Sequence, residues 1–164
     1  MKTLFSLLTI LGLSLIAPAQ NCKYKIDGVD KTTGKQTTIT KSKMIWSVPF
    51  KWAVQMSMQE VDSECSVVFV FDYSAGGATK VANKDAELIF VLQDGTEVKL
   101  KRGNEKETYP ITKEQMDSML KSKVSTMRYY YTNVKTNEYT NHPFYQATDG
   151  EADDIQALIK CVNK

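Results

Sequence analysis

Alternation of apolar and polar residues predicts strands over the first two thirds of the chain. The period of two begins at residues 22–27 and is longest over residues 44–58, where the even positions are mostly apolar. The segment 36–41 between them is rich in threonine and is expected to be extended. The long alternation of residues 44–58 indicates one bent strand or two strands in phase. Pro49 lies within it, and because proline cannot donate a ladder hydrogen bond, we expect it at an edge, a bulge or the break between two strands.

Two later segments are apolar on both faces. Residues 66–73 and 86–92 carry runs of Val, Ile, Leu and Phe, a pattern typical of strands in the middle of a covered sheet. Asp94-Gly95 comes directly after the second run and is a strong hairpin signal. It leads into a further predicted strand over residues 96–101.

Helix signals occur in the C-terminal half of the chain. Thr112 and Gln115 have the spacing of a capping box, and Thr148 and Glu151 repeat it. Residues 124–132 between them predict another strand, rich in tyrosine. The order predicts an α+β domain whose antiparallel sheet, sandwich-like or single and twisted, is covered by two short helices. The apolar residues at helical spacing are Met116, Met119 and Leu120, and then Ile155, Leu158, Ile159 and Val162.

The first 19 residues have the order of an export signal. A positive start at Lys2 precedes an apolar core over residues 4–16, and Ala17-Pro18-Ala19 offers small residues to a signal peptidase. The core is too short to span a membrane comfortably, and its other interpretation is a buried core strand. The order favours a signal peptide over residues 1–19 and a single domain over residues 20–164, which would be periplasmic or secreted.

Composition and charge narrow the class of partner. With 42% hydrophobic and 24% charged residues, the chain matches a folded soluble protein, which excludes a disordered chain or a polytopic membrane protein. Removal of Lys2 with the signal leaves 20 basic and 19 acidic residues, so there is no basic excess for a nucleic-acid partner. No second apolar run of about 18 residues follows, so we expect no membrane span after signal removal.

The three cysteines are Cys22, Cys65 and Cys161, all in the predicted mature part. Cysteines tend to pair in an oxidising compartment, and three leave one over, so we expect one disulfide and one buried thiol. A bond between Cys22 and Cys161 would join the chain ends, but the sequence leaves all three pairings open. We do not expect lipidation of Cys22, because Asn21 is a poor match for the small residue that precedes a lipidated cysteine.

Motifs for catalysis, metal binding and phosphate binding are missing from the sequence. His142 is the single histidine, so a Ser-His-Asp or Cys-His pair would have to use it, and its polar surroundings fit an ordinary surface residue. No Cys-x-x-Cys, nucleophile elbow or Walker sequence occurs. The acidic residues of segment 149–154 lack the order of an EF-hand and fit a first helical turn. We therefore expect no catalytic set, no metal and no cofactor.

Aromatic residues give the one positive indication of function. Trp46 and Trp52 share an apolar alternation and are expected in the core. Residues 129–131 are consecutive tyrosines, so at least one of them has to face solvent or a second layer. Exposed tyrosines stack on sugars or anchor protein partners. The candidate ligand-binding residues are Tyr130, Tyr139 and Tyr145.

Several features together carry a family resemblance. They are the export signal, the Leu-x-Asp-Gly-x-x-x-x-Leu hairpin of residues 92–100, the Tyr-Pro-Ile-Thr-x-x-Gln helix start of residues 109–115, and a cysteine in the final helix. In these features the chain resembles uncharacterised exported domains that are common in Bacteroidota. Such domains have no assigned activity, so the resemblance implies only an exported location and a fold.

The sequence favours a non-catalytic exported domain that binds an unknown protein or glycan partner in the cell envelope. The alternative is a small hydrolase whose carboxylates or thiol converge only in three dimensions. A third interpretation is a structural or assembly subunit, which would show a large apolar patch or an unprotected sheet edge.

Expressed in a bacterial host with residues 1–19 in place, the exported protein is expected to begin at Gln20, because Ala17 and Ala19 occupy the positions read by the peptidase. Intact mass and N-terminal sequencing measure this directly. A product that keeps residue 1, or one that gains the mass of acyl chains at Cys22, would contradict the expectation.

Overall fold

The computed structural model describes residues 22–48, 52–72, 80–81, 87–104, 107–133, 138–141 and 145–163. The strands in these residues pair antiparallel and are joined by two helices, which confirms the predicted α+β class. The predicted signal peptide lies outside the described residues. The strands are β1 Tyr24–Val29, β2 Gln36–Thr40, β3 Lys43–Val48, β4 Trp52–Val61, β5 Glu64–Asp72, β6 Lys80–Val81, β7 Glu87–Leu92, β8 Glu97–Lys101, β9 Thr108–Pro110, β10 Val124–Asn133, β11 Glu138–Asn141 and β12 Tyr145–Gln146; the helices are α1 Lys113–Lys121 and α2 Asp149–Lys160.

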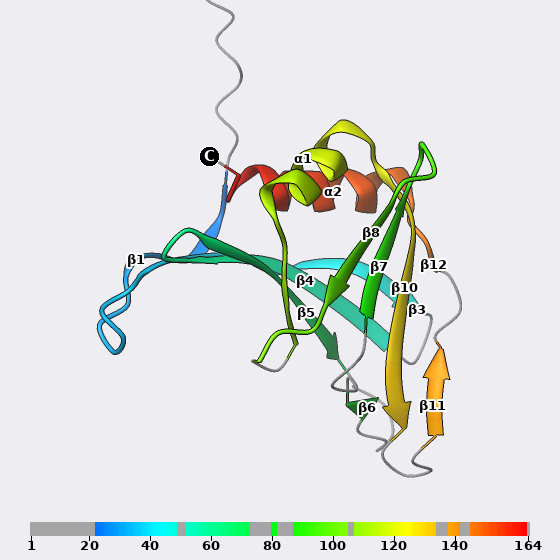
Figure 1. Ribbon diagram of the computed structural model, residues 1–164, viewed down its shortest axis with the longest axis horizontal. Helices are drawn as coiled ribbons and strands as arrows, with labels where there is room; N and C mark the ends of the chain where they lie inside the picture. Colours follow the sequence, from blue (N-terminus) through cyan, green and yellow to red (C-terminus); the bar gives the residue numbers. More distant parts are fainter. Residues whose placement is uncertain are drawn as a thin grey trace, which may run out of the picture.

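The strands form two sheets. The first has the order β1-β2-β4-β5-β9, with β3 also paired to β4, and the second has the order β11-β10-β7-β8, with β6 and β12 also paired to β10. Both helices lie at one end of the molecule, and the strands of the second sheet run downwards from there in the view of Figure 1. One continuous cluster of buried side chains draws on both sheets and both helices.

The predicted hairpin and the predicted central strand are both present. Strands β7 and β8 pair from Val91 opposite Glu97 onwards, and Gly95 turns the chain with a φ of 86°, a value that favours glycine. The Asp94 carboxylate accepts from the Thr96 N–H at 2.9 Å and braces the turn. Strand β7 lies between β8 and β10, as its two apolar faces predict.

The long alternation of residues 44–58 is two strands, β3 and β4, that pair with each other. Register shifts between Met44 and Trp46, so Ile45 is an extra residue in β3. Ile45 is fully buried and Met44 is 57% exposed, the reverse of what alternation at even positions predicts; there the prediction is wrong. A bulge of one residue exchanges the two faces of a strand. In β4 the even positions are buried as predicted, at Val54, Met56 and Met58.

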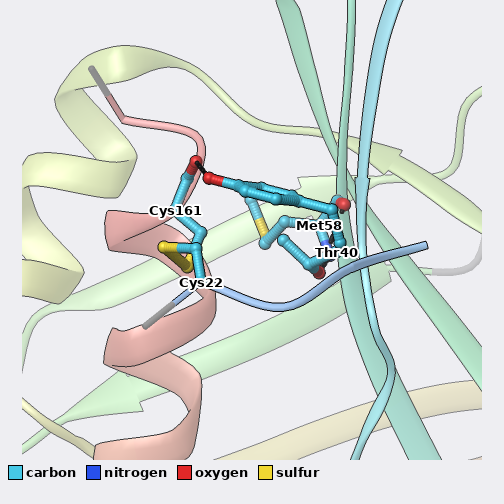
Figure 2. Close-up of a disulfide and its surroundings, with 5 residues drawn as sticks. Cys22, Thr40, Met58 and Cys161 are labelled. Carbon is cyan, nitrogen blue, oxygen red and sulfur yellow. Dashed lines mark hydrogen bonds between the residues drawn. A yellow bond between two sulfur atoms is a disulfide. The ribbon is translucent and has the colours of Figure 1, made fainter. Parts of the chain in front are cut away.

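Strands β2 and β3 pair with successive parts of β4, and between these parts the buried Thr40 side chain bonds the backbone of β4. The Thr40 hydroxyl accepts from the Met58 N–H at 2.9 Å and donates to the Met58 carbonyl at 3.4 Å, so one side chain replaces a rung of the ladder (Figure 2). A buried backbone group without such a partner would cost about 1–3 kcal/mol. The chain can therefore bend at residues 41–42 without leaving Met58 unsatisfied.

Both predicted capping boxes are formed. The Thr112 hydroxyl accepts from the Gln115 N–H while the Gln115 side chain returns to the Thr112 N–H, and Thr148 and Glu151 do the same for α2. Two further acidic residues of α2 form ion pairs, one with the residue before β10 and one with the first residue of β3. Asp153 pairs with Lys123 at 2.6 Å, and Asp154 pairs with Lys43 at 2.8 Å.

A disulfide joins Cys22 to Cys161, with 5.7 Å between the two Cα atoms. Of the three pairings that the sequence left open, this is the one that fastens the start of β1 to the end of α2, as Figure 2 shows. The Tyr24 hydroxyl adds a hydrogen bond of 3.2 Å to the Cys161 carbonyl. Because the Cys22 sulfur is used in this bond, it has no thiol left to carry a lipid.

Replacing Cys22 and Cys161 by serine together should lower the free energy of unfolding by about 2–5 kcal/mol, because a closed loop of this length restricts the unfolded chain strongly. Urea unfolding followed by tryptophan fluorescence measures the change. Cys65→Ser is the matched control, since this thiol is free in the structure. Equal unfolding midpoints for the double variant and the parent protein would contradict the expectation.

Candidate functional site

Backbone pairing brings the three candidate tyrosines to neighbouring strands. Tyr139 of β11 is opposite Thr132 of β10, so it lies diagonally across from Tyr130. Tyr145 of β12 is opposite Met127, which is buried. Opposed residues of an antiparallel pair share a face, and positions two apart along a strand do too. The register therefore places Tyr130 and Tyr139 on one face of the second sheet, and Tyr145 at a position of the face that carries Met127.

The structure does not test the predicted exposure or burial of several aromatic side chains. The backbone is described at Tyr130, Tyr139 and Tyr145, so the exposure of their rings stays a prediction. The same holds for the expected burial of Trp46 and Trp52. His142 lies outside the described residues altogether.

A surface hollow of about 670 Å³ is present where three segments meet. The end of the β4–β5 hairpin, the first turn of α1 and the residues after α2 form its walls. The hairpin turn itself, Asp62-Ser63, has φ values of 50° and 71°, a conformation that glycine or asparagine usually supplies. The side chains that give the hollow its chemistry are Glu60, Glu64, Cys65, Lys113, Met116 and Asn163.

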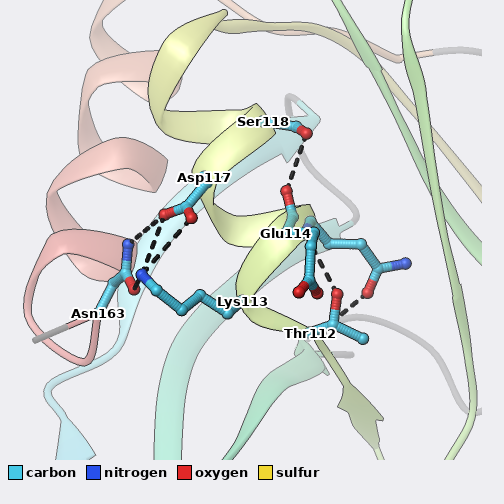
Figure 3. Close-up of polar contacts among 7 residues, drawn as sticks. Thr112, Lys113, Glu114, Asp117, Ser118 and Asn163 are labelled. Atoms are coloured by element: carbon cyan, nitrogen blue, oxygen red, sulfur yellow. Dashed lines mark hydrogen bonds and ion pairs between the residues drawn. The ribbon is translucent and has the colours of Figure 1, made fainter.

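The polar groups on the helix side of this hollow bind one another. Asn163 donates to the Asp117 carboxylate at 2.9 Å and accepts from the Lys113 ammonium at 3.2 Å, and Lys113 lies 3.5 Å from Asp117 (Figure 3). The hydrogen bond from Asn163 and the charge of Lys113 hold the pKa of Asp117 below its usual range. This network joins the first half of α1 to the short segment after α2, and within it the charges of Lys113 and Asp117 offset each other.

Cys65 is the free cysteine, and its surroundings keep it protonated. It is opposite Glu60 in the β4–β5 ladder and borders the hollow. Partial burial raises the pKa of the thiol, and the Glu60 carboxylate raises it further. A nucleophilic cysteine needs the opposite, a pKa lowered by a nearby cation or helix N-terminus. The geometry therefore disfavours a thiol-dependent enzyme at this hollow.

The carboxyl groups with clear pKa shifts give no sign of a general acid. Hydrogen bonds lower the pKa values of these exposed carboxyl groups, which lie in turns, at the start of β8 and on α1; they are Asp30, Asp94, Glu97, Glu114 and Asp117. A general acid at neutral pH needs a raised pKa instead. Among the described residues, no three His, Cys, Asp or Glu side chains gather closely enough to hold a metal ion. Neither described helix has the length and apolar character needed to cross a membrane.

The hollow could not be predicted from the sequence. Its walls come from segments about 50 residues apart, and the turn at Asp62-Ser63 lacks the glycine that marks a tight hairpin. The acidic residues Glu60 and Glu64 flank that turn and were the available signal. The sequence predicted one buried thiol without naming it; the free cysteine in the structure is Cys65, and it is half-buried.

Glu60→Gln should lower the pKa of Cys65, because it removes a negative charge that disfavours the thiolate. At pH 8 the thiolate fraction then rises, and the thiol should react faster with 5,5′-dithiobis(2-nitrobenzoate). The rate is measured against pH for the parent, for Glu60→Gln and for the control Glu64→Gln, which changes a neighbouring charge in the same hollow. An equal acceleration by the two variants would rule out a specific effect of Glu60.

No protein-family model, no curated protein and no solved structure shows significant similarity to the chain. The resemblance to exported domains of Bacteroidota stays a prediction, and so does the periplasmic or secreted location. The function therefore rests on what the described residues can do.

Proposed function

We propose that the protein is an exported, non-catalytic domain of the cell envelope that binds a protein or glycan partner through tyrosines of its second sheet. The observation that carries the proposal is the register of β10 with β11, which makes Tyr130 and Tyr139 diagonal neighbours. Diagonal positions are about 7–8 Å apart, within reach of two aromatic rings. Paired rings of this kind stack on a sugar or fill a hot spot of a protein interface.

Two observations support the binding function over the alternative of a hydrolase. The free thiol of Cys65 has a raised pKa, which suppresses nucleophilic reactivity at neutral pH. The carboxyl groups with clear shifts have lowered pKa values, which suits ion pairs and caps better than proton transfer. The disulfide adds support for an oxidising compartment, where such bonds persist.

Replacing Tyr130 and Tyr139 by alanine should weaken binding to a glycan or envelope protein about tenfold or more, since each ring would supply an anchor of the interface. The full chain, exported and purified, is applied to an array of bacterial glycans and to purified envelope proteins. Fluorescence titration then compares the parent with the variants.

Tyr130→Phe and Tyr139→Phe are the matched controls, because they keep the ring and remove only the hydroxyl. Retention of binding by these variants with loss in the alanine variants supports an aromatic surface. Undiminished binding by the double alanine variant would overturn the proposed site. Absence of binding to both classes of partner would overturn the proposed function.

A further inference from the structure

We infer that the free edge of β1 is a docking site for an acidic, extended segment of a partner protein, which adds to the first sheet as one more strand. This inference rests on the protein-binding form of the proposed function but uses a different surface from Tyr130 and Tyr139. Strand addition of this kind takes its affinity from backbone hydrogen bonds and its specificity from side chains on either side of the edge.

Strand β1 is the last strand of the first sheet and pairs only with β2 within the described residues. An edge strand presents alternate N–H and C=O groups without a ladder partner. Register shifts between Tyr24 and Ile26, so the regular part of the edge is residues 26–29. Figure 1 shows the turn after this strand, residues 30–35, projecting away from the rest of the molecule, so a partner chain can approach the edge.

Two other end strands are less available than β1. The opposite end of the first sheet is β9, which has three residues and ends at Pro110, a residue without an N–H. At β8 of the second sheet, the Gln115 side chain of α1 donates to the Lys99 carbonyl at 3.1 Å and occupies part of the edge. These contacts make β1 a better template for an added strand than β8 or β9.

Exposed apolar side chains concentrate on β1. Among the described residues, the exposed large hydrophobic side chains are Ile26, Val29 and Met44, with exposed fractions of 40%, 63% and 57%. Ile26 and Val29 both belong to the regular part of the β1 edge. An added strand would cover apolar surface at these two positions as well as pair with the backbone.

Charge identifies the chemistry of the partner. Residues 22–48 contain six lysines and two aspartates, whereas residues 49–164 contain 14 basic and 17 acidic residues. Lys35 and Lys43 pair with Asp62 and Asp154. The other four are exposed and make no ion pair within the described part of the chain; they are Lys23, Lys25, Lys31 and Lys41. Asp27 and Asp30 offset two of these four charges, so the β1 side keeps a net positive charge while the whole chain is almost neutral, and it favours a negative partner.

An acidic peptide fits better than the other candidate occupants. A second copy of this chain would bring two lysine-rich edges together, and like charges oppose that pairing. Anionic lipid or polysaccharide would satisfy the lysines but not the backbone groups of residues 26–29. An extended acidic peptide satisfies both.

The β1 edge is held in place before any partner binds. The disulfide of Cys22 and the hydrogen bond from Tyr24 to Cys161 anchor one end of the strand to α2 (Figure 2). At the other end, Val29 is opposite Gln36 of β2, and the Gln36 carbonyl accepts from the Asp62 N–H at 3.0 Å, which ties the β1–β2 hairpin to the β4–β5 turn. A strand fixed at both ends loses little conformational freedom on binding, which favours affinity.

The test is selection from a random octapeptide display library on the full chain, exported so that its disulfide forms. We expect the selected peptides to be rich in Asp and Glu and poor in Pro, because each proline removes a backbone donor. A synthetic copy of the strongest peptide is then titrated by fluorescence anisotropy. Lys25→Glu and the double variant Ile26→Ser/Val29→Ser should each weaken its binding about tenfold, and the control Lys101→Glu, with the same change of net charge on β8, should leave it unchanged.

Chemical variants of the peptide separate strand addition from simple charge attraction. Two peptides are made, one methylated on the odd backbone nitrogens and one on the even ones, so that each keeps its charge but loses half of its N–H donors. Only one of the two sets faces β1, so methylation of that set should abolish binding and methylation of the other should not. Three outcomes would overturn the inference. They are equal binding of both methylated peptides, equal peptide affinity of Lys25→Glu and Lys101→Glu, and a selection that yields no acidic peptide. Binding to phosphatidylglycerol vesicles with no acidic peptide selected would point to a lipid surface instead. Loss of binding in Tyr130→Ala but not in the β1 variants would support the proposed function and overturn this one.

Discussion

Helix α2 lays its apolar face against β3 and β4 of the first sheet and β10 of the second, with α1 packed beside it. Each large side chain buried in this way contributes about 1.5–3 kcal/mol, and without them both sheets would expose their inner faces to water. The ion pairs of Asp153 and Asp154 and the disulfide hold the helix over both sheets at once. The two sheets therefore share a core because one amphipathic helix covers both. Its buried residues are Ala152, Ile155, Leu158 and Ile159.

Features that depend on a few consecutive residues could be predicted from the sequence. Both helix starts follow from a threonine three residues before a Gln or Glu, and the β7–β8 turn follows from Asp94-Gly95. The α+β class follows from the order of these local signals. The bulge at Ile45 could not be predicted, because its alternative, an unbroken alternation, has the same local pattern and only the packing against β4 decides between them.

For the candidate sites too, the residues could be named from the sequence but their arrangement in space could not. The tyrosines could be named from the sequence, but which of them are neighbours depends on the β10–β11 and β10–β12 registers, which no short segment encodes. The lysine-rich stretch of residues 22–48 was visible as a charge count, yet its meaning depends on β1 being at the end of a sheet. The pairing of Cys22 with Cys161 required knowing that α2 returns to the start of β1.

The cross-link also determines how the protein responds to mechanical force. Tension applied through residues before Cys22 and after Cys161 runs along two cysteines and one covalent bond, and it bypasses all 138 residues between them. Hydrogen-bonded strands would carry no load, so pulling on both flanks would leave the fold intact until the sulfur bridge is reduced. Reduction would transfer the load to β1 and to the end of α2, the two elements that lie next to the cysteines. A domain built this way would act as an inextensible link while oxidised and as an extensible one when reduced.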